Sequence, residues 1–323
     1  MKTLKSIVLI LISIVAVGAI ILNLDRIKEK FKTIETSIKK EVVIKDSNEF
    51  TKKYNFKYIK QVNNYEPHNI EDIKNIYYSV LNQGWDEFTF YCSEEYTTCL
   101  EDMESVSNNQ ELLSDINNYV NPFNSYSSIR TTYDDQGEVR ILVKHVYTKE
   151  EVETLNKAID KIIKDNTNDN QTIDEKIKSI HDYIINTTKY DTVKSTTKTS
   201  TYDSSRIGGI INDHYAICSA YADITAVILD KLGLENYKIS SANHVWNAVK
   251  VNNNWLHLDL TWDDPVSSSG IDTLIHTYFL ITEQELLKAD EEETLDGNTK
   301  IKEEHNYNRQ TYPEISNQKE LYQ

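Results

Sequence analysis

The chain is short of basic side chains. Its 323 residues include 35 Lys and Arg against 51 Asp and Glu, which gives a formal net charge of −16. Because nucleic-acid binding depends on basic surface patches, this balance argues against a nucleic-acid partner. The acidic excess otherwise indicates only a well-solvated surface.

Familiar metal-binding spacings are also missing. The sequence contains no Cys-x-x-Cys and no His-Glu-x-x-His segment, the patterns typical of many zinc sites. We therefore expect no metal and no cofactor. One alternative stays open, a metal site formed by His244, His257 and Asp259 with Cys218 as a further ligand.

Cysteine is scarce, with three residues in the whole chain. Cys92 and Cys99 lie close together, whereas Cys218 stands alone. In an exported protein, an odd count of this kind fits one local disulfide and one free functional thiol. The alternative is three unrelated buried thiols.

One long apolar run stands at the N-terminus. Residues 6–24 follow Lys2 and Lys5 and are almost entirely apolar, which is near the roughly 20 residues that span a bilayer. Residues 17–19 are a poor version of the exit of a cleaved signal peptide, so we favour an uncleaved signal anchor. The basic residues between 26 and 32 run against the positive-inside rule. A short basic head before an apolar core is nevertheless an export signal, and we expect the rest of the chain to lie outside the cell, on its surface.

Patterning divides the chain into four parts. We expect a transmembrane signal anchor at 1–25, a charged linker or stalk at 26–48, a small α+β domain at 49–147 and a second domain at 148–323.

The first of these two domains alternates helical and strand patterns. Asn69 and Asp72 predict the capped start of a helix. The other predicted elements are strands at 87–91 and 139–147 and a short helix at 111–120. His68 and His145 stand alone, so we find no catalytic constellation in this domain.

The second domain opens with two predicted helices. Each begins with a capping box, Thr148 with Glu151 and Thr172 with Glu175. His181 falls inside the second helix, and we interpret it as structural. Residues 192–205 are rich in Ser and Thr with almost nothing apolar, which is typical of an exposed loop.

Cys218 stands where a helix is expected to begin. Apolar residues recur at helical spacing from Ser219 to Leu232, and Gly233 follows as a stop signal. Unpaired backbone N–H groups at a helix start stabilise a thiolate and a developing oxyanion. Taken alone, Cys218 fits a small buried apolar residue equally well.

Two strands are expected downstream, at 245–251 and 255–261, around an Asn-rich turn. If Lys250 lies opposite Trp255, then Asp259 lies opposite Trp246 with His244 as its diagonal neighbour on the same face. A shift of one residue would move Asp259 to the other face. In the first register, His244 can act as the base for Cys218, with Asp259 holding its tautomer. The alternatives are a packing histidine and a carboxylate tied up in local turn hydrogen bonds.

These segments resemble the transglutaminase-like core, a branch of the papain-like thiol enzymes. That family typically shows Gly-Val-Cys-x-Gly-Tyr-Ala, His-Ala-Trp-Asn and a strand ending in Asp-x-Thr-Trp-Asp-Asp-Pro. The counterparts here are Ala216–Ala222, His244–Asn247 and Asp259–Pro265. The resemblance extends from about Lys149 to the C-terminus.

Further segments carry the resemblance less specifically. Lys189–Asp191 fits the element before the nucleophile loop, and Tyr278–Leu280 with His305 resembles the closing strand and its histidine. The departures are Ala216 and Ala220, where the family usually has glycine.

The resemblance implies an α+β papain/transglutaminase-like core, in which a helix with the cysteine packs on an antiparallel sheet with the histidine and aspartate. It implies the catalytic residues Cys218, His244 and Asp259, with Tyr190 as a weak candidate for a further oxyanion donor. The expected function is that of a bacterial membrane-anchored thiol enzyme. It would cut amide bonds in surface or cell-wall peptides, or pass an acyl group from glutamine to an amine. The alternative is a non-catalytic adhesion or wall-binding module that keeps the fold.

Overall fold

The computed structural model describes residues 41–265, 273–298 and 300–316. The chain divides into two compact units at Val43 and Ile44, and every helix and strand of the described residues lies in the second unit, Ile44–Gln323. The expected membrane anchor at 6–24 lies outside the described residues. Within the described ranges, no helix combines the length and the apolar content that crossing a bilayer requires.

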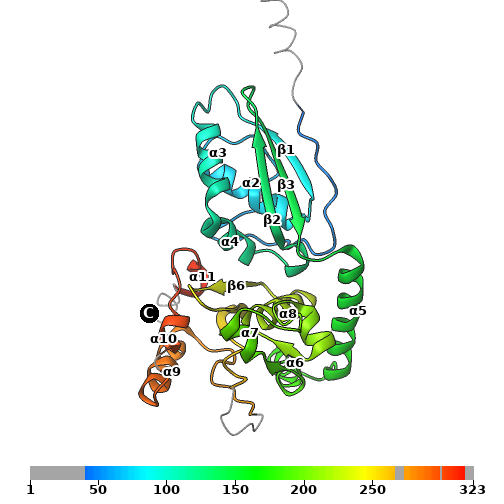
Figure 1. Cartoon of the computed structure of the whole chain (residues 1–323), viewed down its shortest axis with the longest axis vertical. Helices are drawn as coiled ribbons and strands as arrows, with labels where there is room; N and C mark the ends of the chain where they lie inside the picture. The colour runs from blue at the N-terminus through cyan, green and yellow to red at the C-terminus, as the bar shows by residue number, and fades with distance from the viewer. Residues whose placement is uncertain (1–40, 266–272, 299, 317–323) are drawn as a thin grey trace, which may run out of the picture. The chain divides into compact units, whose positions relative to one another are not determined.

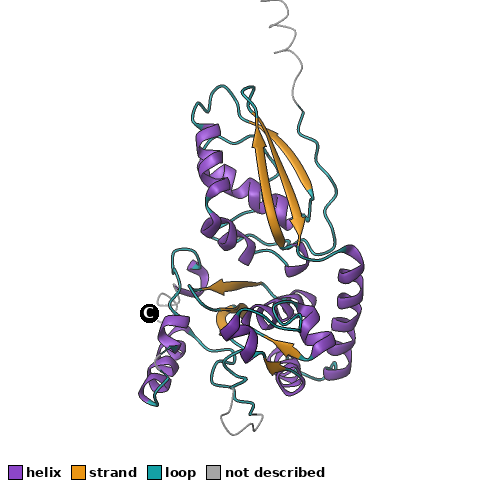
Figure 2. Ribbon diagram, in the orientation of Figure 1, coloured by secondary structure: helices purple, strands orange, loops and turns teal. Residues whose placement is uncertain are grey.

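Residues 49–147 form what we call the N-terminal module (Figure 1). Its elements are α2 (Ile70–Asn82), β1 (Glu87–Tyr91), α3 (Cys99–Asn108), α4 (Gln110–Asn118), η1 (Pro122–Asn124), β2 (Tyr126–Tyr133) and β3 (Glu138–His145). The strands form an antiparallel sheet in the order β1-β3-β2. Figure 2 shows α2, α3 and α4 on one side of this sheet. Alternate residues of β1 and β3, including Phe88, Phe90 and Ile141, are buried.

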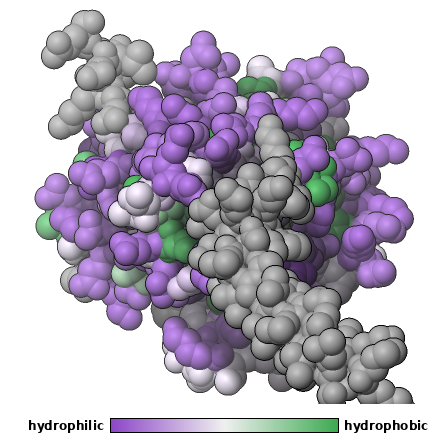
Figure 3. All heavy atoms as spheres, turned by 90° about the horizontal axis from the view of Figure 1, so that it is seen from above, coloured by the Kyte–Doolittle hydropathy of each residue, from purple (hydrophilic) through white to green (hydrophobic). Residues whose placement is uncertain are grey.

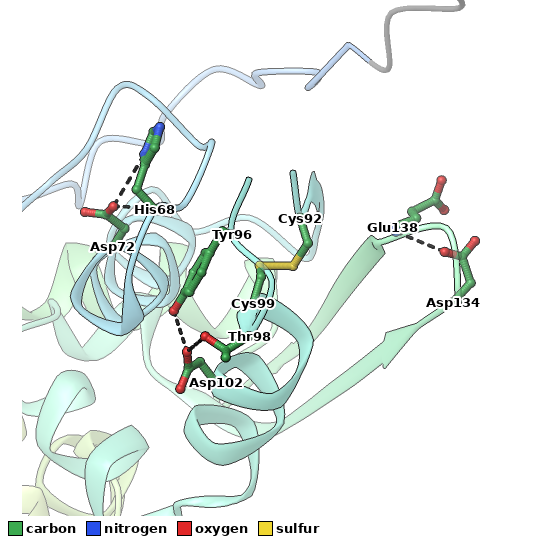
Figure 4. Close-up of a disulfide and its surroundings, with 9 residues drawn as sticks. All are labelled: His68, Asp72, Cys92, Tyr96, Thr98, Cys99, Asp102, Asp134 and Glu138. Carbon is green, nitrogen blue, oxygen red and sulfur yellow. Dashed lines mark hydrogen bonds and ion pairs between the residues drawn. A yellow bond between two sulfur atoms is a disulfide. The ribbon is translucent and has the colours of Figure 1, made fainter. Parts of the chain in front are cut away.

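The Cys92–Cys99 disulfide is present in this module, so the expectation of one bridge and one free thiol at Cys218 is confirmed. The bridge links the segment after β1 to the first residue of α3 (Figure 4). Beside it, the Tyr96 and Thr98 hydroxyls donate to the Asp102 carboxylate at 2.7 and 2.8 Å. The start of α3 is therefore fixed both covalently and by hydrogen bonds.

Residues 148–316 form the C-terminal module. Its helices are α5 (Lys149–Asn166), α6 (Ile173–Thr187), α7 (Thr192–Thr197), η2 (Gly209–Asp213), α8 (Cys218–Lys231), α9 (Glu283–Leu295), α10 (Ile301–Glu304) and α11 (Pro313–Ser316). Its strands are β4 (Lys189–Tyr190), β5 (Tyr215–Ala216), β6 (Asn236–Ser240), β7 (Val245–Val251) and β8 (Asn254–Leu258). Both predicted capping boxes are formed, at Thr148 and at Thr172. The helix α8 packs against β6 and β7 of the antiparallel sheet β6-β7-β8.

The predicted hairpin register is confirmed. Lys250 pairs with Trp255, and the ladder continues to Asn247 opposite Leu258. The turn residues Asn252 and Asn253 have φ of +50° and +67°, the left-handed conformation that a two-residue hairpin turn requires and that asparagine tolerates. Three asparagines between two apolar strands therefore specify which face the residues beyond β8 occupy.

Two expectations need correction. Residues 192–205 are not wholly loop, because Asp191 caps the short helix α7 through a 2.9 Å hydrogen bond from the Lys194 N–H. The segment Tyr278–Leu280 is not a strand. Only Ile281 makes a bridge, with His257, and Leu280 has φ of +51°, which is incompatible with a continuous strand.

The two modules share a polar and aromatic seam. The buried Lys52 ammonium donates to the Asn236 carbonyl at 2.7 Å and lies 3.5 Å from Asp230 at the end of α8. The Asn118 amide donates to the Tyr312 hydroxyl at 2.7 Å. Both predicted domains thus lie in one compact unit, and the boundary at 147/148 stays a prediction. Seen from above, the visible surface is mainly hydrophilic, with small apolar patches (Figure 3).

Candidate active site

Cys218 is the first residue of α8, as the sequence predicts. The residue before it, Ile217, is extended and provides no side-chain cap. The N–H groups of the first turn are therefore left without the usual capping acceptor. Cys218 itself is partly exposed and unpaired, so this helix start combines an accessible thiol with backbone donors.

The backbone that leads into Cys218 is held from both sides. Strand β5 pairs in parallel with β4, Tyr190 beside Ala216, and the Ile217 N–H donates to the Ser204 carbonyl at 2.8 Å. Gly209 makes this approach sterically feasible, because a Cβ there would lie 2.5 Å from the Asp203 carbonyl oxygen and 2.6 Å from that of Tyr215. The position of the thiol is thus set by the loop before it as well as by the helix.

The alanines in place of the family's glycines do not strain this entry. Ala216 is in β5 and Ala220 in α8, and both are completely buried. Neither is among the described residues with positive φ. Glycine's special backbone freedom is therefore not required at either position.

His244 and Asp259 come together as the register predicts. His244 Nε2 lies 2.5 Å from Asp259 Oδ2, and both side chains are buried. The other carboxylate oxygen, Oδ1, accepts the backbone N–H groups of Thr261 and Trp262 at 2.9 and 3.3 Å. Asp259 is thus fully hydrogen-bonded, which is what a buried carboxylate requires.

Cys218 completes the group. The Cys218 thiol is a hydrogen-bonding neighbour of the His244 ring. Because Nε2 is committed to Asp259, Nδ1 is the nitrogen left to face the thiol. The structure therefore brings all three predicted site residues together. Cys218 begins α8, His244 immediately precedes β7, and Asp259 immediately follows β8.

The electrostatics favour a charged ring and a charged carboxylate. Burial opposes protonation of His244, but the Asp259 carboxylate and then Cys218 outweigh it and raise the pKa of His244 to about 10. Burial likewise opposes ionisation of Asp259, but His244 and then His305 hold its pKa well below its usual range. An imidazolium beside a thiol is the arrangement that stabilises a thiolate.

A second group fixes the His244 ring from behind. The Trp246 ring stacks on His244 with centroids 5.5 Å apart and planes 13° apart. Its Nε1–H donates to His257 Nδ1 at 3.0 Å, and His257 Nε2 lies 3.0 Å from Glu283 Oε2. His257 therefore orients Trp246, and through it His244, instead of joining Asp259. The alternation of the strand predicts that His257 and Asp259 share a face, but not that His257 has other partners.

His305 makes the contact that the sequence leaves unspecified. Its Nε2 lies 3.2 Å from Asp259 Oδ2 and its Nδ1 lies 2.8 Å from Asp290 Oδ1, with all three groups buried. Asp290 was missed by sequence reasoning. It opens the acidic run 290–293 in α9, which carries no signal that its first member turns inward.

Tyr190 lies near the thiol. Its hydroxyl is raised in pKa to about 12, first by burial and then by the neighbouring charges of Cys218 and Glu304. The hydroxyl therefore stays protonated at neutral pH and can donate a hydrogen bond.

Two groups in the described part of the chain bring three potential metal-ligating atoms within 4.8 Å of one another. They are His244 with Asp259 and His305, and His181 with Asp182 and His276. The set His244, His257 and Asp259 is not among them, and both His257 nitrogens have other partners. In the second group the Lys178 ammonium lies 2.6 Å from Asp182 and 2.9 Å from His276. A cation of the protein's own already neutralises that carboxylate.

Comparison with known proteins identifies the C-terminal module. Residues 142–273 match a family model described as "Transglutaminase-like domain". Six solved chains also match, among them a "Crystal structure of a TGase" with 16% identity and a TM-score of 0.34, over 45% of this chain and 46% of that one. The match therefore spans about half the length of that chain, and at this similarity it adds nothing to the family match. No curated protein sequence matches.

Proposed function

We propose that this chain is a cysteine-dependent amide-bond enzyme, on the premise that its residues 142–273 match the transglutaminase-like domain. The observation that carries the proposal is the hydrogen-bonded group of Cys218, His244 and Asp259, with the thiol at the start of α8. A thiol, a base and an orienting carboxylate in this order are the parts of nucleophilic acyl chemistry.

The first half-reaction forms a thioester. The Cys218 thiolate attacks the carbonyl carbon of the substrate amide, and the carbon–nitrogen bond then breaks. The His244 imidazolium gives its proton to the leaving amine. In the second half-reaction His244 takes a proton from the incoming acceptor, which attacks the thioester carbon and releases Cys218 as a thiolate.

The oxyanion that forms in each half-reaction needs hydrogen-bond donors. The uncapped N–H groups in the first turn of α8 are one source. The Tyr190 hydroxyl, whose charge state responds to Cys218, is our candidate for a second source. Removing one such donor typically costs about 100-fold to 1000-fold in turnover.

We propose that the acceptor is water and that the substrates are surface proteins or cell-wall peptides. The Cys92–Cys99 disulfide supports an oxidising location. Together with the apolar run at 6–24, it favours a membrane-anchored protein whose enzymatic part faces outward.

The competing function is adhesion or wall binding without chemistry. The two alanines in place of the family's glycines were its main support, but neither position requires glycine. The second layer of hydrogen bonds behind His244, through Trp246 and His257, also favours catalysis, because an inert module has no need to orient an imidazole.

The test is mass spectrometry of cell-wall peptides and surface proteins from cells that carry the wild type or Cys218→Ala. We expect specific peptide or isopeptide bonds to remain intact in the variant. The matched control is the double variant Cys92→Ser/Cys99→Ser, which removes the other sulfurs and should leave the cleavage pattern unchanged if it folds. Identical peptides in wild type and Cys218→Ala, with a Cys218 that alkylates no faster than a free thiol, would sink the proposal.

A further inference from the structure

A second histidine–carboxylate pair lies directly behind Asp259. His305 follows α10 and is held by Asp290 of α9, with 2.8 Å between Nδ1 and Oδ1. The His305 ring is 5.6 Å from the His244 ring, centroid to centroid. A row thus runs from the partly exposed Cys218 through the buried His244, Asp259 and His305 to Asp290.

The two neighbours of His305 determine its protonation. Each ring nitrogen faces a carboxylate oxygen, Asp259 Oδ2 at 3.2 Å and Asp290 Oδ1 at 2.8 Å. Because an ionised carboxylate only accepts, both nitrogens must carry a proton for both bonds to form. The ring that satisfies this geometry is an imidazolium. In agreement, the two carboxylates outweigh burial and raise the pKa of His305.

Other titratable groups reach this row from every element packed on it. They are Tyr190 of β4, His257 of β8, Asp263 after β8, Tyr278 before α9, Glu293 of α9 and Glu304 of α10. Most are acidic. His257 is held neutral, because its Nδ1 accepts a hydrogen bond from the Trp246 indole N–H, and burial lowers its pKa. Among these described groups, His244 and His305 are therefore the two that carry positive charge.

We infer that His305 is a positioning residue whose fixed positive charge beside Asp259 sets the pH range over which Cys218 and His244 exist as thiolate and imidazolium. The inference rests on the proposed function of the same site. It assigns His305 no contact with substrate. It adds a positive charge that partly offsets the negative charge of Asp259. Without His305, the full effect of the Asp259 carboxylate would fall on His244.

The sign of the effect follows from electrostatics. A nearby cation stabilises the Cys218 thiolate and destabilises the His244 imidazolium, so it moves both limits of the reactive range to lower pH. Removing the cation moves both limbs of the profile to higher pH. At the 5.6 Å ring separation, Coulomb's law with an effective dielectric constant of about 20 gives a shift of about 2 pH units for His244. Cys218 lies farther along the row, so its limb moves less.

The experiment measures the rate of Cys218 alkylation against pH in the full-length chain, with iodoacetate as the reagent, because its negative charge makes the rate depend on the His244 imidazolium as well as on the thiolate. Because Cys92 and Cys99 are bridged, Cys218 is the free thiol that the reagent can modify. The assay measures this modification directly, so it does not require a known substrate. In His305→Gln, whose amide can still donate to Asp259, both limbs should move about 1 to 2 units to higher pH. The matched control is His145→Gln, which removes a histidine of the N-terminal module, outside this row, and should leave both limbs in place.

Each result is decisive. Unmoved limbs in His305→Gln, limbs that move to lower pH, or an equal shift in His145→Gln would overturn the inference while leaving the proposed function intact. A wild-type Cys218 that shows no thiolate below the ordinary thiol range would instead count against the proposed function itself.

A measurement on the wild type covers the case in which His305→Gln does not fold. Nitrogen-15 spectra of histidine-labelled protein distinguish rings with two protonated nitrogens from neutral rings. We expect His305, recognised by its contacts with Tyr278 and Trp262, to show two protonated nitrogens at neutral pH. A neutral His305 ring at that pH contradicts the inference.

Discussion

His244 links the chemistry of the site to the stability of the fold at the scale of single residues. Its pKa is raised from 6.5 to about 10 because Asp259 and Cys218 outweigh the effect of burial. A raised pKa means that the folded state holds the proton more tightly than the unfolded chain does. The stabilisation is therefore complete below about pH 6.5, declines as pH rises, and is gone above about pH 10.

The matching prediction compares unfolding free energies across that range. The pKa of His244 rises from 6.5 to about 10 on folding. Between these two pH values, the unfolding free energy of the wild type should fall by on the order of a few kcal/mol relative to that of His244→Gln. Denaturant titration at several pH values measures this difference. In His257→Gln the alkaline decline should persist, since the pKa of His257 is lowered and not raised. If the difference in unfolding free energy between the wild type and His244→Gln stays constant with pH, then folding does not raise the pKa of His244.

The element that places the thiol is the entry to α8, and Gly209 is its tightest point. A methyl group at 209 would meet two backbone oxygens at 2.5 and 2.6 Å, so the backbone must move and β5 must move with it. We expect Gly209→Ala to cost about 1 to 3 kcal/mol of stability and to slow Cys218 alkylation at neutral pH.

Gly233, at the other end of α8, provides the control. Its φ is +77° and a Cβ there has open space. The substitution Gly233→Ala should therefore lower stability by about 1 kcal/mol without changing the alkylation rate. If Gly209→Ala alkylates at the wild-type rate, the loop before Cys218 does not position the thiol.

The same elements show what sequence can and cannot predict. The hairpin register follows from local signals, because the turn asparagines and the period of two fix which face Asp259 occupies. The capping boxes and the start of α8 are equally local. The contacts of His305 with Asp290 and of Trp246 with His257 join segments many residues apart. No periodicity encodes them, and Asp290, the partner of His305, is hidden within an acidic run.

At the scale of the whole molecule, the question is whether the two modules fold independently. Lys52 belongs to the N-terminal module, yet its buried ammonium group has its partners, Asn236 and Asp230, in the C-terminal module. Burial lowers the pKa of Lys52, and the neighbouring Asp230 opposes this effect. The Lys52 ammonium can therefore stay both charged and buried only while Asp230 lies beside it. Removing one partner of such a pair typically costs about 3 to 5 kcal/mol.

We therefore predict one unfolding transition for both modules, and a loss of about 3 kcal/mol in Lys52→Met. The measurement is denaturant unfolding followed separately by Trp85 of the N-terminal module and Trp255 of the C-terminal module, each kept as the single tryptophan. Both probes should report the same midpoint and shift together in Lys52→Met. The neighbouring exposed Lys53 supplies the control, and Lys53→Met should leave both midpoints unchanged. Two separate midpoints in the wild type would restore 147/148 as a folding boundary, because the Lys52 contacts would then be too weak to couple the modules.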